Sequence, residues 1–228
     1  MPLRPGMVDV AELPHELQEL IWTTYREGLR TRRAEYFIRT NRVILDHIRT
    51  LCQSDDDFHR VLDWMAHMLQ YSNIKPQRGI MLVGPPGCGK TLFAKFVTLL
   101  LGQNNVSRSR TLRHHFNYFL DGTTLVTLDE CNVSEEIAHI NSLISNQAIT
   151  IRRRYHDAIV VPSFHRVLVT ATLLSPLLLI SIPFQQRFTV IPCDTVNGQE
   201  FHEAMHDPIN MSYFRQYLME RHVDANGL

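Results

Sequence analysis

The 228-residue sequence lacks several features that would define its class at once. It has only four cysteines, scattered and without a CxxC pair, which argues against a zinc knuckle or a disulfide framework and favours a reducing, intracellular setting. It has no net charge, because 23 basic side chains balance 23 acidic ones. Any contact with nucleic acid must therefore come from local basic clusters. The N-terminus shows no signal-peptide pattern.

Long hydrophobic runs are also missing. The longest, Leu173 to Phe184, is interrupted by serines and prolines, so we expect it to be buried core and expect no membrane partner. Hydrophobic residues make up 44% of the chain and charged residues 20%, which is typical of a globular protein. The length suits one large domain, or one domain with a smaller one.

The spacing of apolar residues divides the chain into three parts. From Pro14 to about Tyr71 they recur at three- and four-residue intervals, which predicts helices after a loose lead-in. From Arg78, short apolar runs alternate with helical patterns, and from Glu200 helical spacing returns. The predicted fold is α/β, with a central, mostly parallel sheet flanked by helices. The predicted domains are a helical region at 1–72, a core at 73–200 and a helical segment at 201–228.

Individual elements follow from the same patterns. The helix at 133–145 is expected to begin at an Asn132 cap, with two glutamates in its first turn. A basic stretch from Arg26 to Arg42 has two open interpretations, a solvated helix face or a contact with nucleic acid or another subunit. The predicted strands are 79–83, 125–128, 149–151, 158–161, 167–170 and 188–191, and the other core helix is 90–101.

A glycine-rich segment between the first predicted strand and the helix at 90–101 matches the pattern GxxxxGK[ST]. Its glycines let backbone N–H groups converge on phosphate oxygens, and the helix N-terminus adds positive potential. Lys90 is predicted to bridge the β- and γ-phosphates of ATP, and Thr91 to hold Mg²⁺. The predicted nucleotide-binding residues are Gly84, Pro85, Pro86, Gly87, Cys88, Gly89, Lys90, Thr91 and Leu92.

Two carboxylates follow the strand at 125–128. Asp129 is predicted to bind Mg²⁺ directly or through water, and Glu130 to polarise the attacking water as a general base. The alternative is a solvated acidic turn.

Two further residues fit a hydrolase. Thr172 follows the strand at 167–170 and is predicted to sense the γ-phosphate, with a helix cap as the alternative. Arg187, placed at the start of the last strand, is predicted to be an arginine finger that stabilises charge on the transferred phosphoryl group. Its alternative role is a structural salt bridge.

Two strand-like runs enclose a basic and aromatic segment, which predicts a hairpin. Arginines bind phosphates and an aromatic ring can stack on a base or sugar, so the tip suits nucleic acid, although an exposed hairpin without a ligand is the alternative. The predicted nucleic-acid-binding residues are Arg152, Arg153, Arg154, Tyr155 and His156. His202 and His206 have a spacing that can bind metal, but without a third ligand we favour solvated side chains.

These motifs, in this order, resemble superfamily 3 helicase domains of the viral and phage primase-helicase type, which are AAA+ P-loop ATPases. The likeness covers roughly residues 60–220. The segments that carry it outside the loop and acid pair are Asp63 to Gln70 before the loop, Phe116-Asn117 as an "FN" element, the arginine hairpin as motif B′, the strand ending at Thr172 as motif C, Gln186-Arg187-Phe188 as an arginine-finger turn, and Asn210 to Leu218.

The sequence departs from that family in two motifs. Motif C usually ends in asparagine, where this chain has Thr172. Motif B′ usually carries a lysine, where this chain has Arg154, which keeps the charge but not the geometry. No primase domain is present, so we expect a truncated, excised or stand-alone motor.

The resemblance implies an ATP-dependent DNA helicase that acts as a ring, commonly a hexamer, during replication. Arg187 would act on the neighbour's ATP, and hairpins bearing Arg154 and His156 would surround single-stranded DNA. Residues 1–72 would form an assembly collar. The implied cofactors are ATP and Mg²⁺, the implied partner is a primase or another replication protein, and the implied location is the host cytoplasm or nucleus. An AAA+-type ATPase that remodels proteins and a non-hydrolysing ring component are the alternatives.

Overall fold

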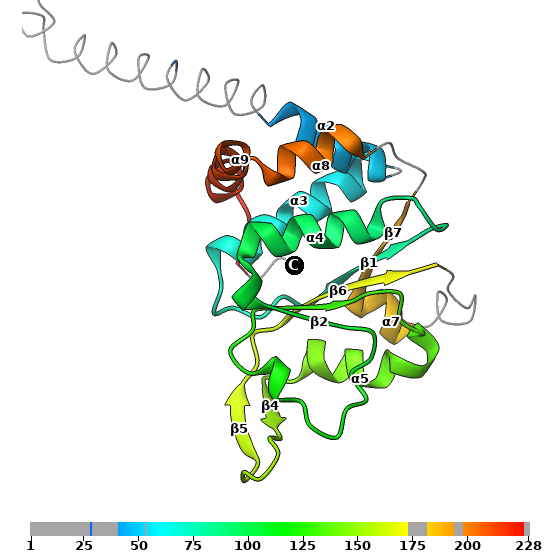
Figure 1. Ribbon diagram of the computed structural model, residues 1–228, viewed down its shortest axis with the longest axis vertical. Helices are drawn as coiled ribbons and strands as arrows, with labels where there is room; N and C mark the ends of the chain where they lie inside the picture. The colour runs from blue at the N-terminus through cyan, green and yellow to red at the C-terminus, as the bar shows by residue number, and fades with distance from the viewer. Residues whose placement is uncertain (1–27, 29–40, 53, 173–181, 194–197, 226–228) are drawn as a thin grey trace, which may run out of the picture.

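The structure is a computed structural model that describes residues 28, 41–52, 54–172, 182–193 and 198–225. These residues form an α/β fold with a parallel central sheet flanked by helices, which confirms the predicted fold class (Figure 1). Most of the basic stretch at 26–42, and residues 173–181 of the long apolar run, lie outside the described residues. No helix in the described ranges is long and apolar enough to cross a membrane.

The central sheet has five parallel strands in the order β2-β3-β6-β1-β7. Every residue of β3 and β6 is buried, as expected for strands that are covered by helices on both faces. The strands are β1 (Gly79–Val83), β2 (Val106–Ser109), β3 (Leu125–Leu128), β6 (Arg166–Ala171) and β7 (Phe188–Pro192).

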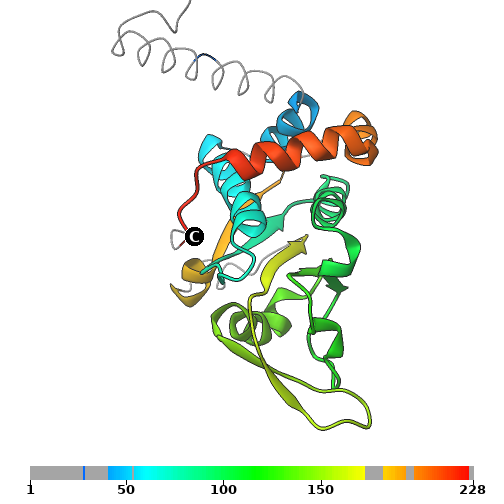
Figure 2. The same cartoon turned by 90° about the vertical axis from the view of Figure 1, so that its left-hand side faces the viewer.

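Helices cover the two faces of the sheet unequally (Figures 1 and 2). Adjacent residues of β1 point to opposite faces, so Leu82 joins one hydrophobic core and Met81 the other. The larger core lies under α2 (Arg42–Leu51), α3 (Asp55–Gln70), α4 (Lys90–Leu101), α8 (Gln199–His206) and α9 (Pro208–Glu220). The smaller core lies under α5 (Val133–Ser145) and α7 (Ile182–Arg187). Two short 3-10 helices, η2 (Gln103–Asn105) and η3 (Tyr118–Leu120), lie in the connections.

Aromatic packing joins α8 and α9 to α4, the helix that follows the glycine-rich loop, and the ring of His47 on α2 stacks on that of Phe201. The ring of Phe96 on α4 lies 5.0 Å from that of Phe201 on α8 and 5.3 Å from that of Phe214 on α9, measured between centroids. Helices from both sides of the predicted 73–200 core therefore share one hydrophobic core with α4. The domain boundaries themselves stay predictions.

A buried arginine fixes the chain that enters the sheet. Arg166, at the start of β6, is fully buried, and its guanidinium donates to the carbonyls of Ser72 and Ile74, each at 2.9 Å, and to that of Tyr71 just after α3. Burial lowers the pKa of Arg166 to about 10. Carbonyl groups at a helix C-terminus attract a cation, so these bonds hold the end of α3 against β6.

The predicted elements largely match the structure. β1, α4, β3 and α5 have the predicted bounds, and the other predicted strands agree to within one residue at each end. β2 was not predicted, because Val106–Ser109 contains little apolar sequence. Asn132 is the N-cap residue of α5, as predicted, but its side chain makes no capping bond to the backbone and instead donates to Glu135 at 2.6 Å.

The predicted hairpin is present and forms its own antiparallel sheet. It consists of β4 (Ala148–Ile151) and β5 (Ile159–Pro162), and it projects from the body of the fold (Figures 1 and 2). The basic and aromatic residues therefore lie at a protruding tip.

Buried histidines should make the stability depend on pH. Burial lowers the pKa of His47 from 6.5 to about 4, and burial also lowers the pKa of His67 and His165. Because the unfolded chain takes up protons first, the free energy of unfolding should fall as the pH drops from about 6.5 towards 4. In His47→Phe, which preserves a ring against Phe201, this slope should be shallower, as measured by urea unfolding at several pH values.

Val43→Ala on the same helix is the control, since Val43 is exposed and its replacement removes no titratable group, so the slope should stay unchanged. An equal pH dependence of the free energy of unfolding in His47→Phe and in the parent would contradict the role given to His47.

Candidate functional site

The glycine-rich loop lies at the carboxyl edge of the sheet, between β1 and the N-terminus of α4. Gly87 and Gly89 have φ of 84° and 91°, a left-handed conformation that glycine adopts without strain. A side chain at Gly84 would place its Cβ 2.4 Å from the carbonyl oxygen of Cys193, so the close approach requires glycine there. The loop thus has the backbone shape of a phosphate cradle at a helix N-terminus.

The Lys90 side chain lies within its own loop. It is only 3% exposed, and its Nζ donates to the carbonyl oxygens of Gly84 at 2.7 Å and Pro85 at 3.0 Å. The same Nζ lies 3.7 Å from Oε1 of Glu130. A buried ammonium is thereby held by carbonyl oxygens beside the acid pair, where it can exchange them for phosphate oxygens.

Asp129 accepts hydrogen bonds from three other elements. Its Oδ1 accepts from Thr170 on β6 at 2.8 Å and from Thr91 on α4 at 3.2 Å, while its Oδ2 is ion-paired with Arg108 on β2. Burial alone would raise the pKa of Asp129, but the bonds from Arg108, Thr170 and Thr91 and the charge of Arg108 outweigh it and lower the pKa. Asp129 is therefore held as a carboxylate.

Glu130 has an unusual backbone that turns it toward the loop. Its φ is 51°, which is rare for a residue other than glycine and costs of order 1–3 kcal/mol. Its N–H donates to the Thr170 hydroxyl at 2.9 Å, and its Oε2 accepts from Thr172 at 2.8 Å. Thr170 therefore bonds both acidic residues, while the Thr172 hydroxyl bonds Glu130; the predicted role of Thr172 in sensing the γ-phosphate stays a prediction.

Sequence reasoning missed Arg108 and Thr170. Arg108 lies on the unpredicted strand β2, so nothing in the sequence indicated that it would face Asp129. Thr170 lies two residues before Thr172, and the alternation of side chains along a strand could have identified both as members of one face.

Arg187 does not join this cluster within the chain. It was predicted at the start of a strand but is the last residue of α7, and its Nε donates to Ser145 Oγ at 2.8 Å. Phe188 pairs with Gly79 at the amino end of β1, whereas the loop follows the carboxyl end. At about 3.3 Å per residue these ends are roughly 13 Å apart, so Arg187 lies at the opposite edge of the sheet.

The hairpin tip is exposed, and one of its arginines is ion-paired with a residue outside the hairpin. Arg153 is ion-paired with Asp121, and the Arg154 guanidinium lies 4.8 Å from the centre of the Tyr155 ring. Tyr155 is 87% exposed, and His156 is exposed beside it. Arg152, Arg154, Tyr155 and His156 therefore face solvent, while Arg153 already has an internal partner.

His202 and His206 on α8 contact each other. The rings of His202 and His206 are 4.5 Å apart, and Nδ1 of His206 lies 2.7 Å from the carbonyl oxygen of His202. Across the described residues, no group of three or more potential metal ligands is present.

Comparisons with known proteins find partial sequence matches. A model of a family of unknown function (DUF5906) matches residues 82–175, which include the loop and the acid pair. The 26S proteasome subunit RPT4 of Saccharomyces cerevisiae is 51% identical over 97 residues, covering 40% of this chain and 19% of that protein. The cell division cycle protein 48 homolog of Archaeoglobus fulgidus is 30% identical over 110 residues, covering 44% and 15%. The proteasome-associated ATPase of Salinispora tropica is 41% identical over 56 residues, covering 25% and 9%.

The fold matches solved structures over a larger part of the chain. The apo structure of the NrS-1 C-terminal region aligns with a TM-score of 0.66 and 18% identity, covering 81% of this chain and 47% of that one. A second structure of that region, the A form, gives a TM-score of 0.63 over 84% of this chain. The chain thus spans about half of that region and less than a fifth of each curated relative named above. The fold is shared, and the ATPase similarities support a nucleotide-hydrolysing role.

Replacing Thr170 by valine should separate its two bonds from its packing. The part-buried N–H of Glu130 would lose its acceptor and Asp129 one donor, so Thr170→Val should lower the free energy of unfolding at pH 7 by about 1–3 kcal/mol. Because the bond to Thr170 helps depress the pKa of Asp129, the deficit should narrow as the pH falls below 3.8, the usual value for this group.

Denaturant unfolding at pH 7 and in acid measures both effects. Thr127→Val is the matched control, since Thr127 is equally buried on β3 but donates to the Ser107 carbonyl at 3.3 Å. If Thr170→Val and Thr127→Val lost the same free energy of unfolding, and the loss did not change in acid, the role of Thr170 would be contradicted.

Proposed function

We propose that this protein is an ATP-dependent DNA helicase that hydrolyses ATP between the subunits of a ring and translocates on single-stranded DNA during replication. One observation carries the proposal: a loop and acid pair suited to ATP lie on a sheet from which a basic, aromatic hairpin projects. The resemblance to superfamily 3 helicase domains supplies the order of these parts, and the partial similarity to ATPases supports the hydrolytic step.

The residues around Asp129 fit a hard divalent cation. The hydroxyl of Thr91 and the carboxylate of Asp129 present oxygen ligands 3.2 Å apart, and oxygen ligands of this kind suit Mg²⁺. Mg²⁺ would neutralise charge on the β- and γ-phosphates of bound ATP. Arg108 is ion-paired with Asp129 and helps to lower the pKa of that carboxyl, which keeps it in the ionised form that a cation binds.

The remaining steps belong to side chains of this chain. Lys90 would leave the carbonyls of Gly84 and Pro85 and bind the β- and γ-phosphates, and Glu130 would orient and polarise the attacking water. Thr172 holds Glu130 through its hydroxyl, so it could report the state of the γ-phosphate through that bond. The backbone N–H groups of residues 84–92 would surround the phosphates.

A ring explains the position of Arg187. Within one chain Arg187 lies at the edge of the sheet opposite the loop, whereas an arginine finger must contact the transferred phosphoryl group. In a closed ring of identical subunits the two edges of neighbouring copies would meet, which supplies Arg187 to the neighbour's site. Self-association, a hexamer and a collar formed by residues 1–72 are parts of this proposal.

A second candidate is an AAA+-type ATPase that remodels protein partners. It is favoured by the sequence similarity to a proteasome subunit and a proteasome-associated ATPase, and by the absence of net charge. The two candidates share the ATP site and differ at the hairpin. The protruding tip with Arg154, Tyr155 and His156 favours the helicase, since arginine and aromatic side chains bind single strands.

The experiment that tests the proposal measures ATP turnover with and without single-stranded DNA. We expect stimulation by DNA in the parent chain and its loss in Arg154→Ala/His156→Ala, because the tip would no longer hold the strand. Arg60→Gln/His59→Ala, which removes the same two residue types from α3, is the control and should keep the stimulation. Normal turnover without DNA binding at low salt would favour the protein remodeller.

A further inference from the structure

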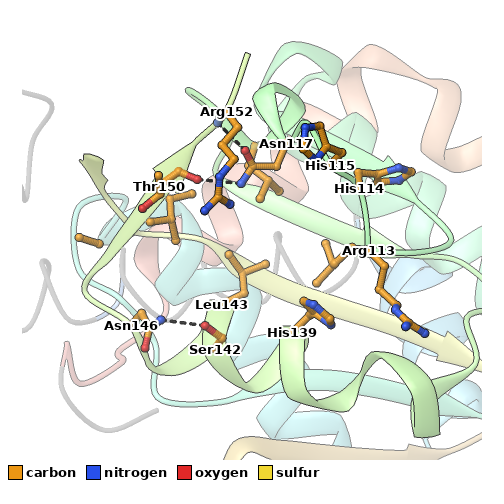
Figure 3. A pocket seen from close by; sticks show the side chains of 14 residues that line it. Arg113, His114, His115, Asn117, His139, Ser142, Leu143, Asn146, Thr150 and Arg152 are labelled. Atoms are coloured by element: carbon orange, nitrogen blue, oxygen red, sulfur yellow. Dashed lines mark hydrogen bonds between the residues drawn. The ribbon is translucent and has the colours of Figure 1, made fainter. Parts of the chain in front are cut away.

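A pocket at the base of the hairpin lies outside the proposed ATP site and shares Arg152 with the predicted nucleic-acid-binding residues of the tip. It is an open cavity of about 570 Å³, a size common for small-ligand sites, between the loop before η3, helix α5 and strand β4 (Figure 3). Figure 3 shows Asn117 and Arg152 on the hairpin side, with His139 and Ser142 on α5. Its lining is Leu112, Arg113, His114, His115, Asn117, Leu120, His139, Ser142, Leu143, Asn146, Ala148, Ile149, Thr150 and Arg152.

The lining carries positive and neutral groups only. Arg113 comes from the loop and Arg152 from the hairpin, and no carboxylate lines the cavity. Arg113 lies 3.6 Å from Glu135, but both side chains are more than half exposed, and such a pair is worth little and can open at little cost. Glu136 is buried nearby and accepts from the backbone N–H of Leu112 at 2.9 Å and from the Thr111 hydroxyl. An anion therefore meets two arginines without a competing exposed carboxylate in the wall.

The rest of the pocket offers apolar surface and rings. Leu120 and Leu143 form a largely buried floor, 7% and 4% exposed. His115 and His139 are exposed imidazoles on opposite elements. A ligand with an anionic part and a flat, partly apolar part matches this lining, and a nucleotide has both.

The pocket is joined rigidly to the hairpin. Asn117 donates to the carbonyl of Thr150 at 2.9 Å and accepts from the N–H of Arg152 at 2.7 Å, while its own N–H donates to the Arg152 carbonyl at 3.2 Å. Asn117 thereby acts as an extra ladder residue beside β4. Arg152 lines the pocket and also begins the basic tip, so a strand bound at the tip leads directly to the cavity.

We infer that this pocket binds one nucleotide unit of single-stranded DNA, with its phosphates against Arg113 and Arg152 and its base against the leucine floor and the imidazoles. The inference rests on the proposed function and adds a second contact, separate from the hairpin tip. Phosphate contacts hold the strand in register, and stacking accepts any base, which suits a motor that moves along DNA.

The test compares the binding of a fluorescent oligothymidylate of about 15 nucleotides by the full chain and its variants. Arg113→Gln/His139→Ala should weaken binding about tenfold. The slope of log K against the logarithm of the salt concentration should become shallower by about 0.7, because one phosphate contact is lost. Arg60→Gln/His202→Ala is closely matched, since Arg60 is also exposed and lies 3.6 Å from a carboxylate, that of Asp57. This control should bind as the parent does.

The outcomes separate the inference from the proposed function. Parental binding by the pocket variant, with loss in the Arg154→Ala/His156→Ala variant, would overturn the pocket and keep the helicase proposal. No binding by the parent at low salt would overturn both. Equal binding of a poly-glutamate peptide, with equal loss in the pocket variant, would assign the site to acidic peptides and overturn the nucleotide. Thermal unfolding identifies variants that fail to fold, and the single His139→Ala, an exposed helix position, then replaces the double variant.

Discussion

The site depends on one carboxylate. Asp129 directly follows β3 and is bonded to β2, α4 and β6 through Arg108, Thr91 and Thr170, so four elements of the fold meet at a single group. The parallel sheet makes this possible because its carboxyl ends lie at one edge. Lys90 and Glu130 are positioned by the same arrangement, one through the loop after β1 and the other through its bond to Thr170.

The molecule separates its chemical parts in space. The loop and acid pair occupy the carboxyl edge of the sheet, Arg187 lies at the amino edge, and the hairpin with its basal pocket projects from the smaller core (Figure 1). Because Arg187 lies at the amino edge, away from the loop of its own chain, this arrangement suits the proposed hydrolysis between subunits. Asn117 joins the hairpin to the rest of the fold through hydrogen bonds, which suits the proposed transfer of movement from the site of ATP hydrolysis to a bound DNA strand.

Sequence reasoning succeeded where the pattern was local. The glycine loop, the acid pair, the hairpin and most element bounds follow from short-range signals, namely apolar runs, glycines and charge. It failed where spatial adjacency decides. Arg108 faces Asp129 only because β2 pairs with β3, and β2 has too little apolar sequence to be recognised. The pocket likewise arises from three separate segments, and Arg187 was assigned to the wrong element because a short helix precedes β7.

We propose that the loop and acid pair bind and hydrolyse ATP, and paired measurements of ATP affinity and turnover on Lys90→Ala and Glu130→Gln test this role. Lys90→Ala should lose both binding and turnover, because the phosphates lose their buried cation. Glu130→Gln should retain ATP without turning it over, because the water loses its base. Turnover at the parental rate in either variant would contradict these roles.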